Sequence, residues 1–215
     1  MILIFDLDGT LVDSAPDIQA AVNRMLAEEG VVPLDLPTIT GFIGNGLPKL
    51  VERAMAARGI GPALHDDLTR VVLGYYNATA SVLTRPYPGV PQALKALQAA
   101  GHRMAVCTNK PEAPARSLLT DLDLMQHFAA VIGGDSLPVT KPDPAPALAC
   151  ITALGGGAAA YIGDSEVDAA TAAAAGLPFY LFTEGYRKSP ISALPHRGTF
   201  SGFADLPALI ADGAA

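Results

Sequence analysis

The chain begins with an apolar run that ends in two acidic residues. Ile2–Phe5 contains only apolar side chains, and Asp6 and Asp8 follow at once in the sequence Asp-Leu-Asp-Gly-Thr. A short, fully apolar run of this kind is typical of a buried strand in a parallel sheet. Open α/β sheets bind ligands at the carboxyl ends of such strands. An isolated Asp-x-Asp-Gly stretch is also typical of an exposed turn, so this segment alone leaves both interpretations open.

A second apolar run ends in a hydroxyl and an amide. Met104–Cys107 leads directly to Thr108 and Asn109, just before an expected helix. Either side chain can cap that helix, and a hydroxyl together with main-chain N–H groups at a helix N-terminus can also hold phosphate oxygens. Further along, Lys141 lies in a Lys-Pro-Asp-Pro loop. Taken alone, this lysine is typical of a solvated loop.

A third apolar run again ends in an acid. Asp164 follows the run Ala-Tyr-Ile-Gly, and Asp168 comes four residues later, which is the spacing that aligns side chains over one helical turn. Asp164 can act as a helix N-cap, and Asp168 can interact favourably with the first turn of the helix. Those local roles do not exclude chemistry.

Four carboxylates gathered at strand ends require a cation. Each pair of unit charges at about 4 Å repels by about 4 kcal/mol when the effective dielectric constant is about 20. Mg²⁺ suits hard oxygen ligands that leave positions to water and phosphate, and Lys141 adds a compact positive charge. A nucleophilic carboxylate, a second carboxyl for proton transfer, a metal, a hydroxyl donor and a lysine together indicate phosphoryl transfer through an aspartyl-phosphate.

The four segments, in this order, resemble motifs one to four of the haloacid dehalogenase superfamily, and the resemblance spans nearly the whole chain. Within that superfamily the chain is similar to the bacterial phosphoglycolate phosphatases in four shorter strings, which are Ile43–Gly46, Thr108–Pro111, Gly133–Asp135 and Lys141–Pro144.

The resemblance implies a role for each acidic residue. Asp6 would attack phosphorus, while Asp8 would protonate the leaving alkoxide and then activate water. Mg²⁺ would be held by Asp6, the main-chain carbonyl of Asp8, and Asp164. Asp168 would orient metal-bound water or Lys141, and Lys141 would neutralise the phosphoryl charge. Dehalogenases proper lack an acid at the position of Asp8, so its presence favours phosphate ester chemistry over carbon–halogen cleavage.

The resemblance also implies the substrate contacts. Thr108 and the main chain of Asn109 would bind the phosphoryl group. Gly44, Asn45 and Gly46 would meet the other end of the substrate with main-chain N–H groups, because glycine lets the backbone approach closely. The expected substrate is a small phosphate monoester, 2-phosphoglycolate, which would give glycolate and phosphate. A nearby cation, such as Lys49 or Arg53, would help to hold its carboxylate.

Two rival classes share part of this inventory. A receiver-type signalling domain also gathers acids, a Thr or Ser and a Lys around Mg²⁺, but it lacks a helical insertion after the first strand. A sugar-phosphate mutase of the same superfamily shares every core motif, as do other small-metabolite phosphatases. Only the insertion separates the mutase from the phosphatase, and Gly44-Asn45-Gly46 resembles the phosphatase version.

The pattern of apolar residues predicts an α/β fold, namely a doubly wound parallel sheet with an inserted α-helical cap domain. Residues 1–14 and 85–215 would form the core, and residues 15–84, which show only helical stripes, would form the cap. Further strands are expected at Arg103–Cys107, Ala129–Ile132, Ala159–Ile162 and Phe179–Phe182, with helices at Pro91–Ala100, Pro114–Leu122, Pro144–Leu154, Val167–Ala175 and from Leu206. The loop Glu184–Lys188 is expected to be solvated and without a role, although the resemblance places it near the entrance of the site.

Composition limits the partners and the cellular compartment that are expected for this chain. The 215 residues carry a net charge of −7 without a basic cluster, which argues against nucleic acid and anionic membranes as partners. The N-terminal run is cut by Asp6, so no signal peptide or membrane anchor is expected, and the two cysteines at unrelated positions favour a reducing cytoplasm. The four histidines lack metal-ligand spacing. Either a monomer or a homodimer is compatible with the sequence.

Overall fold

The computed structural model describes residues 1–79 and 81–213. By its internal packing the chain divides into two compact units, one of Met1–Asp13 with Pro86–Ala215 and the other of Ser14–Arg85. The sequence placed these boundaries at 14/15 and 84/85. The first unit contains the large sheet and is called the α/β unit below, and the second is called the helical unit.

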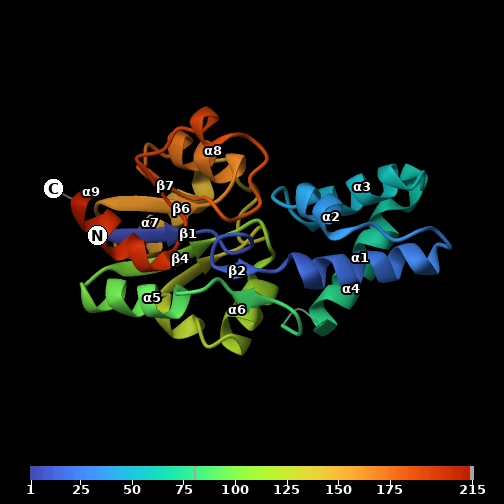
Figure 1. Ribbon diagram of the computed structural model, residues 1–215, viewed down its shortest axis with the longest axis horizontal. Coiled ribbons are helices and arrows are strands. Elements are labelled where there is room, and N and C mark those ends of the chain that lie inside the picture. Colours follow the sequence, from blue (N-terminus) through green and yellow to red (C-terminus); the bar gives the residue numbers. More distant parts are fainter. Residues whose placement is uncertain (80, 214–215) are drawn as a thin grey trace. The chain divides into compact units, whose positions relative to one another are not determined.

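The α/β unit is built on a six-stranded sheet in the order β5-β4-β1-β6-β7-β8 (Figure 1). Every neighbouring pair in it is parallel. The first strand of the chain therefore lies inside the sheet, and later strands are added on both sides of it, as a doubly wound fold requires. The strands are β1 (Ile2–Phe5), β4 (Arg103–Cys107), β5 (Ala130–Ile132), β6 (Ala159–Gly163), β7 (Phe179–Phe182) and β8 (Gly198–Phe200).

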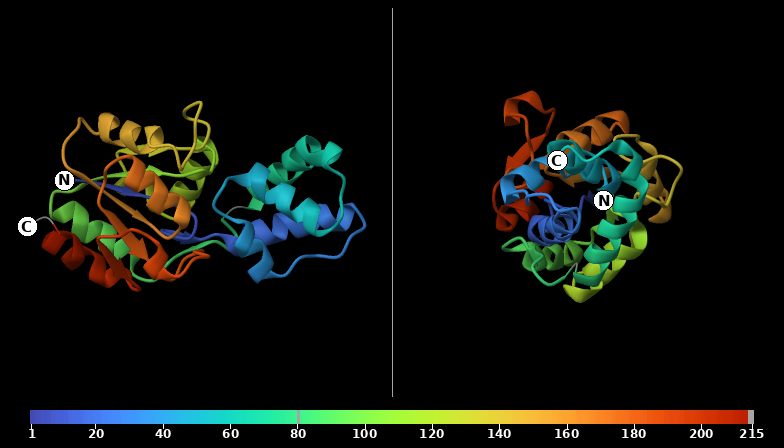
Figure 2. Two further views of the ribbon diagram at one scale, coloured as in Figure 1. Left: turned by 90° about the horizontal axis from the view of Figure 1, so that it is seen from above. Right: turned by 90° about the vertical axis from the view of Figure 1, so that its right-hand side faces the viewer.

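Helices cover both faces of this sheet (Figure 2). Alternate residues of β1 belong to two separate apolar clusters, because successive side chains of a strand point to opposite faces. Leu3 and Phe5 pack with residues of α5, α6 and α9, while Ile2 and Ile4 pack with residues of α7 and α8. The helices are α5 (Val90–Ala99), α6 (Glu112–Asp121), α7 (Ala145–Ala153), α8 (Glu166–Ala174) and α9 (Leu206–Gly213), with 3₁₀ turns at Met125–His127, Ile191–Ala193 and Phe203–Asp205. The predicted fold class is confirmed.

One strand was not predicted from the sequence, in which Phe179–Phe182 is the last run expected to form a strand. Strand β8 adds three residues at the edge of the sheet, and of these only Phe200 is buried. An edge strand with one buried side chain has no apolar run to reveal it. The expected helices of this unit are present, with ends that shift by one or two residues, the usual uncertainty of helix boundaries.

The helical unit contains α1 (Ala15–Glu28), α2 (Leu36–Phe42), α3 (Leu47–Ala57) and α4 (His65–Thr79), with a 3₁₀ turn at Pro62–Leu64. The apolar stripes expected there are largely buried, and they include Ile18, Val22, Met25, Leu26, Leu50, Val51, Ala54, Leu68 and Val72. Val71, expected in the last stripe, is instead 36% exposed. A second sheet contains only the short strands β2 (Val12–Asp13) and β3 (Arg85–Pro86).

A buried carboxylate ties the start of the helical unit to its end. Asp17 in α1 is 1% exposed, and it accepts hydrogen bonds from the main-chain N–H groups of Leu83 and Thr84 and from the Thr84 hydroxyl, the last two at 2.7 Å. Charge-assisted hydrogen bonds of this kind compensate for the burial of the carboxylate. Among the described residues, no helix of either unit is long and apolar enough to span a membrane.

Candidate active site

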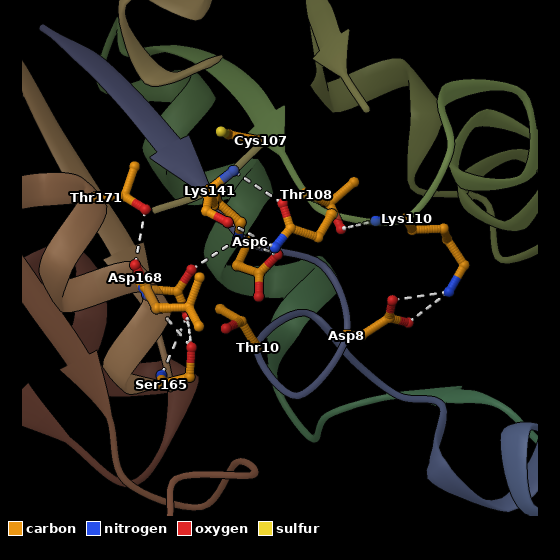
Figure 3. A network of polar contacts seen from close by, with 12 residues as sticks. Asp6, Asp8, Thr10, Cys107, Thr108, Lys110, Lys141, Ser165, Asp168 and Thr171 are labelled. Atoms are coloured by element: carbon orange, nitrogen blue, oxygen red, sulfur yellow. Dashed lines mark hydrogen bonds and ion pairs between the residues drawn. The ribbon is translucent and has the colours of Figure 1, made fainter. Parts of the chain in front are cut away.

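Polar side chains meet at the carboxyl ends of three adjacent strands (Figure 3). Asp6 follows β1, Thr108 follows β4 and Asp164 follows β6. Because β1 pairs in parallel with both β4 and β6, the three strand ends lie at one edge of the sheet. The apolar runs that build the strands thus deliver their terminal polar residues to one place.

Lys141 connects two of the acids. Its Nζ lies 2.8 Å from Asp6 Oδ1 and 2.7 Å from Asp168 Oδ1, and all three side chains are buried. The main chain of Lys141 is held by the Asn109 side chain, whose amide donates to the Lys141 carbonyl and accepts from its N–H. Burial disfavours the charged lysine, but Asp168 and Asp6 outweigh burial and raise the pKa of Lys141. The ammonium group is therefore charged throughout the physiological range.

Asp164 and Asp168 are fixed by hydrogen bonds around the start of α8. The Thr10 hydroxyl donates to Asp164 Oδ1 at 2.6 Å, and the Tyr186 N–H donates to Asp164 Oδ2 at 2.6 Å. Asp168 Oδ2 accepts from the Ser165 hydroxyl and N–H, which completes a capping box. Ser165 is the N-cap of α8, so the N-cap role considered for Asp164 is wrong. Asp168 interacts with the first helical turn as expected and also contacts Lys141.

The acids form a group that fits a divalent cation. Asp6, Asp164 and Asp168 are 8%, 1% and 0% exposed, and one carboxylate oxygen from each lies within 4.8 Å of the other two. Burial and the nearby Asp168 raise the pKa of Asp6 to about 7, although Lys141 opposes the shift, and burial with Asp168 and Asp6 raises the pKa of Asp164. Buried hard oxygen donors whose negative charges repel one another are a suitable donor set for Mg²⁺.

This group differs in one member from the ligand set that the resemblance implied. Asp168 belongs to it, whereas Asp8 was expected to contribute its main-chain carbonyl, an atom that a group of side chains does not include. Among the described residues, no histidine or cysteine is part of such a metal-binding group. Cys107 and Cys150 are free, buried thiols.

Asp8 is paired with a lysine that sequence reasoning missed. Lys110 Nζ lies 2.7 Å from Asp8 Oδ1 and 2.8 Å from Oδ2, and Lys110 is only 8% exposed. Its main-chain N–H also donates to the Thr108 hydroxyl at 3.2 Å. Lys110 lies within the segment Thr108–Pro111, but the resemblance implied no role for it. Its signal in the sequence is a cation two residues after a candidate phosphate-binding hydroxyl.

The loop Glu184–Lys188 also contributes, contrary to expectation. Besides the Tyr186 N–H on Asp164, the Tyr186 hydroxyl donates to Asp13 Oδ1 at 2.7 Å. Gly185 permits this approach, since a Cβ there would lie 2.3 Å from the Asp164 Cβ. A main-chain donor carries no side-chain signature, so nothing in the loop's composition pointed to Asp164.

Gly44, Asn45 and Gly46 lie in the helical unit, in the turn between α2 and α3. Both glycines have positive φ angles, 122° at Gly44 and 81° at Gly46, which residues other than glycine rarely adopt. Gly46 is also the N-cap residue of α3. The turn thus has the backbone freedom expected of it, and it belongs to a different unit from the acidic cluster.

The two cations suggested beside this turn have different partners. Arg53 donates to the Phe42 carbonyl at 2.8 Å and to Asn45 Oδ1 at 2.9 Å, so it braces the turn. Lys49 contacts both carboxylate oxygens of Glu52 at 2.8 Å on an exposed surface.

Comparisons with known proteins show the family of the chain. The sequence profile of haloacid dehalogenase-like hydrolases matches residues 1–176. A phosphoglycolate phosphatase of Cereibacter sphaeroides is 54% identical over 210 residues, covering 97% of this chain and 96% of the relative. One of Rhodospirillum rubrum is 43% identical over 212 residues, covering 95% and 88%. The crystal structure of a predicted phosphoglycolate phosphatase from Haemophilus somnus matches with a TM-score of 0.91 and 32% identity, covering 97% of both chains.

Proposed function

The chain belongs to the haloacid dehalogenase-like hydrolases and is a phosphoric monoester hydrolase, and we propose that it hydrolyses 2-phosphoglycolate with Mg²⁺ through an aspartyl-phosphate on Asp6. The observation that carries this proposal is the buried cluster of Asp6, Asp164 and Lys141 beside Thr108. Family membership also disfavours the receiver-type alternative, because a receiver is a binding module and not a hydrolase.

In the first step, a carboxylate oxygen of Asp6 attacks phosphorus and the ester P–O bond breaks. Lys141, 2.8 Å from Asp6, supports the ionised form of this carboxylate against the burial that raises its pKa. A nucleophile on the end of a rigid strand needs little reorganisation to reach the phosphorus atom. The product of this step is an acyl phosphate on Asp6 and an alkoxide leaving group.

Asp8 handles the protons in both steps. It gives a proton to the departing alkoxide and then takes one from the water that attacks the aspartyl-phosphate, which releases phosphate and restores Asp6. General acid–base catalysis of this kind contributes about 10²- to 10⁴-fold in rate. Asp8 comes two residues after Asp6 in the loop beyond β1, and its carboxylate lies beside Lys110 (Figure 3).

The phosphoryl group is held by the segment after β4 and by Lys141. The Thr108 hydroxyl and the main-chain N–H of Asn109 supply hydrogen bonds, and the Lys141 ammonium offsets negative charge. Asp6, the main-chain carbonyl of Asp8, and Asp164 would hold Mg²⁺, which when bound neutralises phosphate charge and favours in-line attack. Asp168, 2.7 Å from Lys141, would keep that lysine in position.

We propose that the helical unit is a mobile cap formed by residues 15–84, and that residues 1–14 and 85–215 form the catalytic core. Closure of such a cap excludes water, which strengthens electrostatic interactions in the site. Because the core motifs bind only the phosphate, discrimination requires groups that meet the rest of the substrate. The turn of Gly44, Asn45 and Gly46 would do this with main-chain N–H groups. We place this activity in the cytoplasm, in a monomer or homodimer.

The proposal is tested by comparing kcat/KM for 2-phosphoglycolate with the values for glucose 6-phosphate and ribose 5-phosphate. We expect 2-phosphoglycolate to be clearly preferred, since a bulky sugar would hold the cap open. β-Glucose 1-phosphate should be assayed for conversion to the 6-isomer as well. A preference for a sugar phosphate, or isomerisation without phosphate release, would refute the substrate assignment and leave the family intact.

A further inference from the structure

We propose that Lys110 binds the carboxylate of the leaving group, so that part of the specificity for a carboxylated phosphate ester lies in the α/β unit. This inference rests on the proposed function, because it concerns the same site and the same substrate. It assigns a substrate contact to a residue that received no role in the sequence analysis.

The local structure brings Lys110 back toward the site. Its main-chain N–H is anchored on the Thr108 hydroxyl, which follows β4, and its side chain extends to the carboxylate of Asp8 in the loop beyond β1. Figure 3 shows the Lys110 side chain and Asp8 meeting on one side of the group, with Lys141, Asp6 and Asp168 on the other. Lys110 therefore lies near the residue that protonates the leaving group.

The two buried lysines differ in their charged partners. Lys141 is engaged by Asp6 and Asp168, so its charge serves the nucleophile and the phosphoryl group. Lys110 contacts Asp8, the residue proposed above to protonate the leaving group. A second anionic group on the leaving side, brought beside Asp8, would need a cation there to offset repulsion. Lys110 supplies that charge.

The dimensions of 2-phosphoglycolate fit this position. A single methylene carbon separates its ester oxygen from its carboxylate. The ester oxygen and the carboxylate carbon are both bonded to this methylene carbon. A hydrogen bond of about 2.8 Å from Asp8 to the ester oxygen would therefore also bring the carboxylate close to Asp8. The Lys110 Nζ is 2.7 Å from Asp8 Oδ1, so a substrate bound in this way would place its carboxylate near Lys110. An ammonium group carries three donors arranged around one charge, which suits a bridge between two carboxylates.

The cations of the helical unit are less suited to this task. The Lys49–Glu52 pair is exposed, so solvent screens the charge of Lys49, whereas the Lys110–Asp8 pair is largely buried. Arg53 is used to hold the Phe42 carbonyl and the Asn45 side chain. The main-chain N–H groups of the turn at 44–46 are hydrogen-bond donors that carry no full charge. A full charge within the α/β unit complements those donors.

The experiment compares two substrates that differ only at the group in question. In ethyl phosphate, a methyl group replaces the carboxylate of 2-phosphoglycolate and the ester oxygen is kept. With Mg²⁺ present, kcat/KM is measured for both esters in the wild type, in Lys110→Met and in Lys95→Met. Lys95 is an exposed lysine of α5 and serves as the matched control.

We expect Lys110→Met to lose about 10- to 100-fold more activity on 2-phosphoglycolate than on ethyl phosphate, the range for a lost hydrogen bond between charged groups. Lys95→Met should leave both values unchanged. Equal losses on both esters would overturn the inference, because they would mean that Lys110 acts only through Asp8. If Lys110→Met shows no cooperative thermal unfolding, Lys110→Gln replaces it and must show the same selective loss.

The wild-type values distinguish this inference from the proposed function. A wild-type enzyme that does not prefer 2-phosphoglycolate over ethyl phosphate would refute the substrate assignment. A wild-type preference that persists undiminished in Lys110→Met would refute only the role of Lys110.

Discussion

In the helical unit the one buried charged side chain among the described residues, Asp17, is satisfied by main-chain and hydroxyl donors, whereas the α/β unit buries five charged side chains close to one another. Those five are Asp6, Lys110, Lys141, Asp164 and Asp168. Both arrangements remove carboxylates from water, and they differ in what compensates the free-energy cost of burying the charge.

The difference separates a structural acid from reactive acids. Among the described residues, the donors to Asp17 are neutral groups of its own unit, an arrangement that stabilises a fold. Asp6 and Asp164 are instead buried beside like charges, and burial together with this repulsion raises their pKa values. A fold gains nothing from such repulsion. Clusters of buried acids with perturbed pKa values are typical of functional sites, where a ligand completes the balance of charge.

The largest effect should come from replacing the nucleophile. Asp6→Asn should lower kcat by more than about 10³-fold, because an amide cannot form the acyl phosphate. Its free energy of unfolding should not fall, since one of several mutually repelling charges is removed. Steady-state phosphate release and thermal denaturation measure the two quantities. Activity within about tenfold of the wild type would refute the proposed mechanism.

A smaller loss is expected at the proton-transfer residue. Asp8→Asn should lower kcat by about 10²- to 10⁴-fold, because the alkoxide then departs without a proton. The loss should shrink for an ester such as p-nitrophenyl phosphate, whose leaving group needs little protonation. A loss of the same size for both kinds of ester would argue against general acid catalysis by Asp8.

The acidic cluster should require a metal in a pH-dependent way. EDTA should abolish activity and Mg²⁺ restore it, calcium should inhibit, and Asp164→Ala should sharply raise the Mg²⁺ concentration needed. Because the pKa of Asp6 is raised to about 7, protons compete with the metal below that pH. The increase in melting temperature on adding Mg²⁺ should therefore be larger above pH 7 than below it.

In the metal-free protein, stability is expected to fall as the pH rises. A carboxyl whose folded-state pKa is raised from 3.8 to about 7 contributes stability that is present below 3.8 and lost as the pH rises through 7. Melting temperatures in EDTA should thus fall over that interval, and in Asp6→Asn this fall should be smaller. Full activity in a chelator, or an Mg²⁺ shift independent of pH, would contradict the metal site.

The smallest effect on turnover should come from the buried acid of the other unit. Asp17→Asn should lower the free energy of unfolding by about 1–3 kcal/mol, because the amide leaves a main-chain donor of Leu83 or Thr84 unsatisfied. Its kcat should stay within a few-fold of the wild type. A loss of turnover as large as that of Asp6→Asn, at unchanged stability, would remove the distinction between the two kinds of buried acid.

Much of the site could be predicted from the sequence, because it lies at strand ends. Apolar runs locate β1, β4 and β6, and parallel pairing then brings Asp6, Thr108 and Asp164 to one edge. These inferences need only local pattern and the geometry of a parallel sheet. The roles assigned to the residues themselves remain proposals.

The contacts that could not be predicted are those between segments without a periodic pattern. The pairing of Lys110 with Asp8 joins residues 102 positions apart, and the main-chain donor of Tyr186 comes from a loop with no distinctive composition. The clamp at Asp17 depends on N–H groups 66 and 67 residues away. Such contacts depend on where loops lie in three dimensions, which local propensity does not determine.

The central claim is that Asp6 carries the phosphoryl group during turnover. The direct measurement is to quench the Mg²⁺-loaded enzyme in acid during hydrolysis of 2-phosphoglycolate, reduce it with borohydride and analyse its peptides by mass spectrometry. Borohydride converts an aspartyl-phosphate to homoserine, so we expect homoserine at position 6 in the wild type and none when substrate is omitted. Turnover that leaves Asp6 unmodified, or a phosphoryl group on a different side chain, would contradict it.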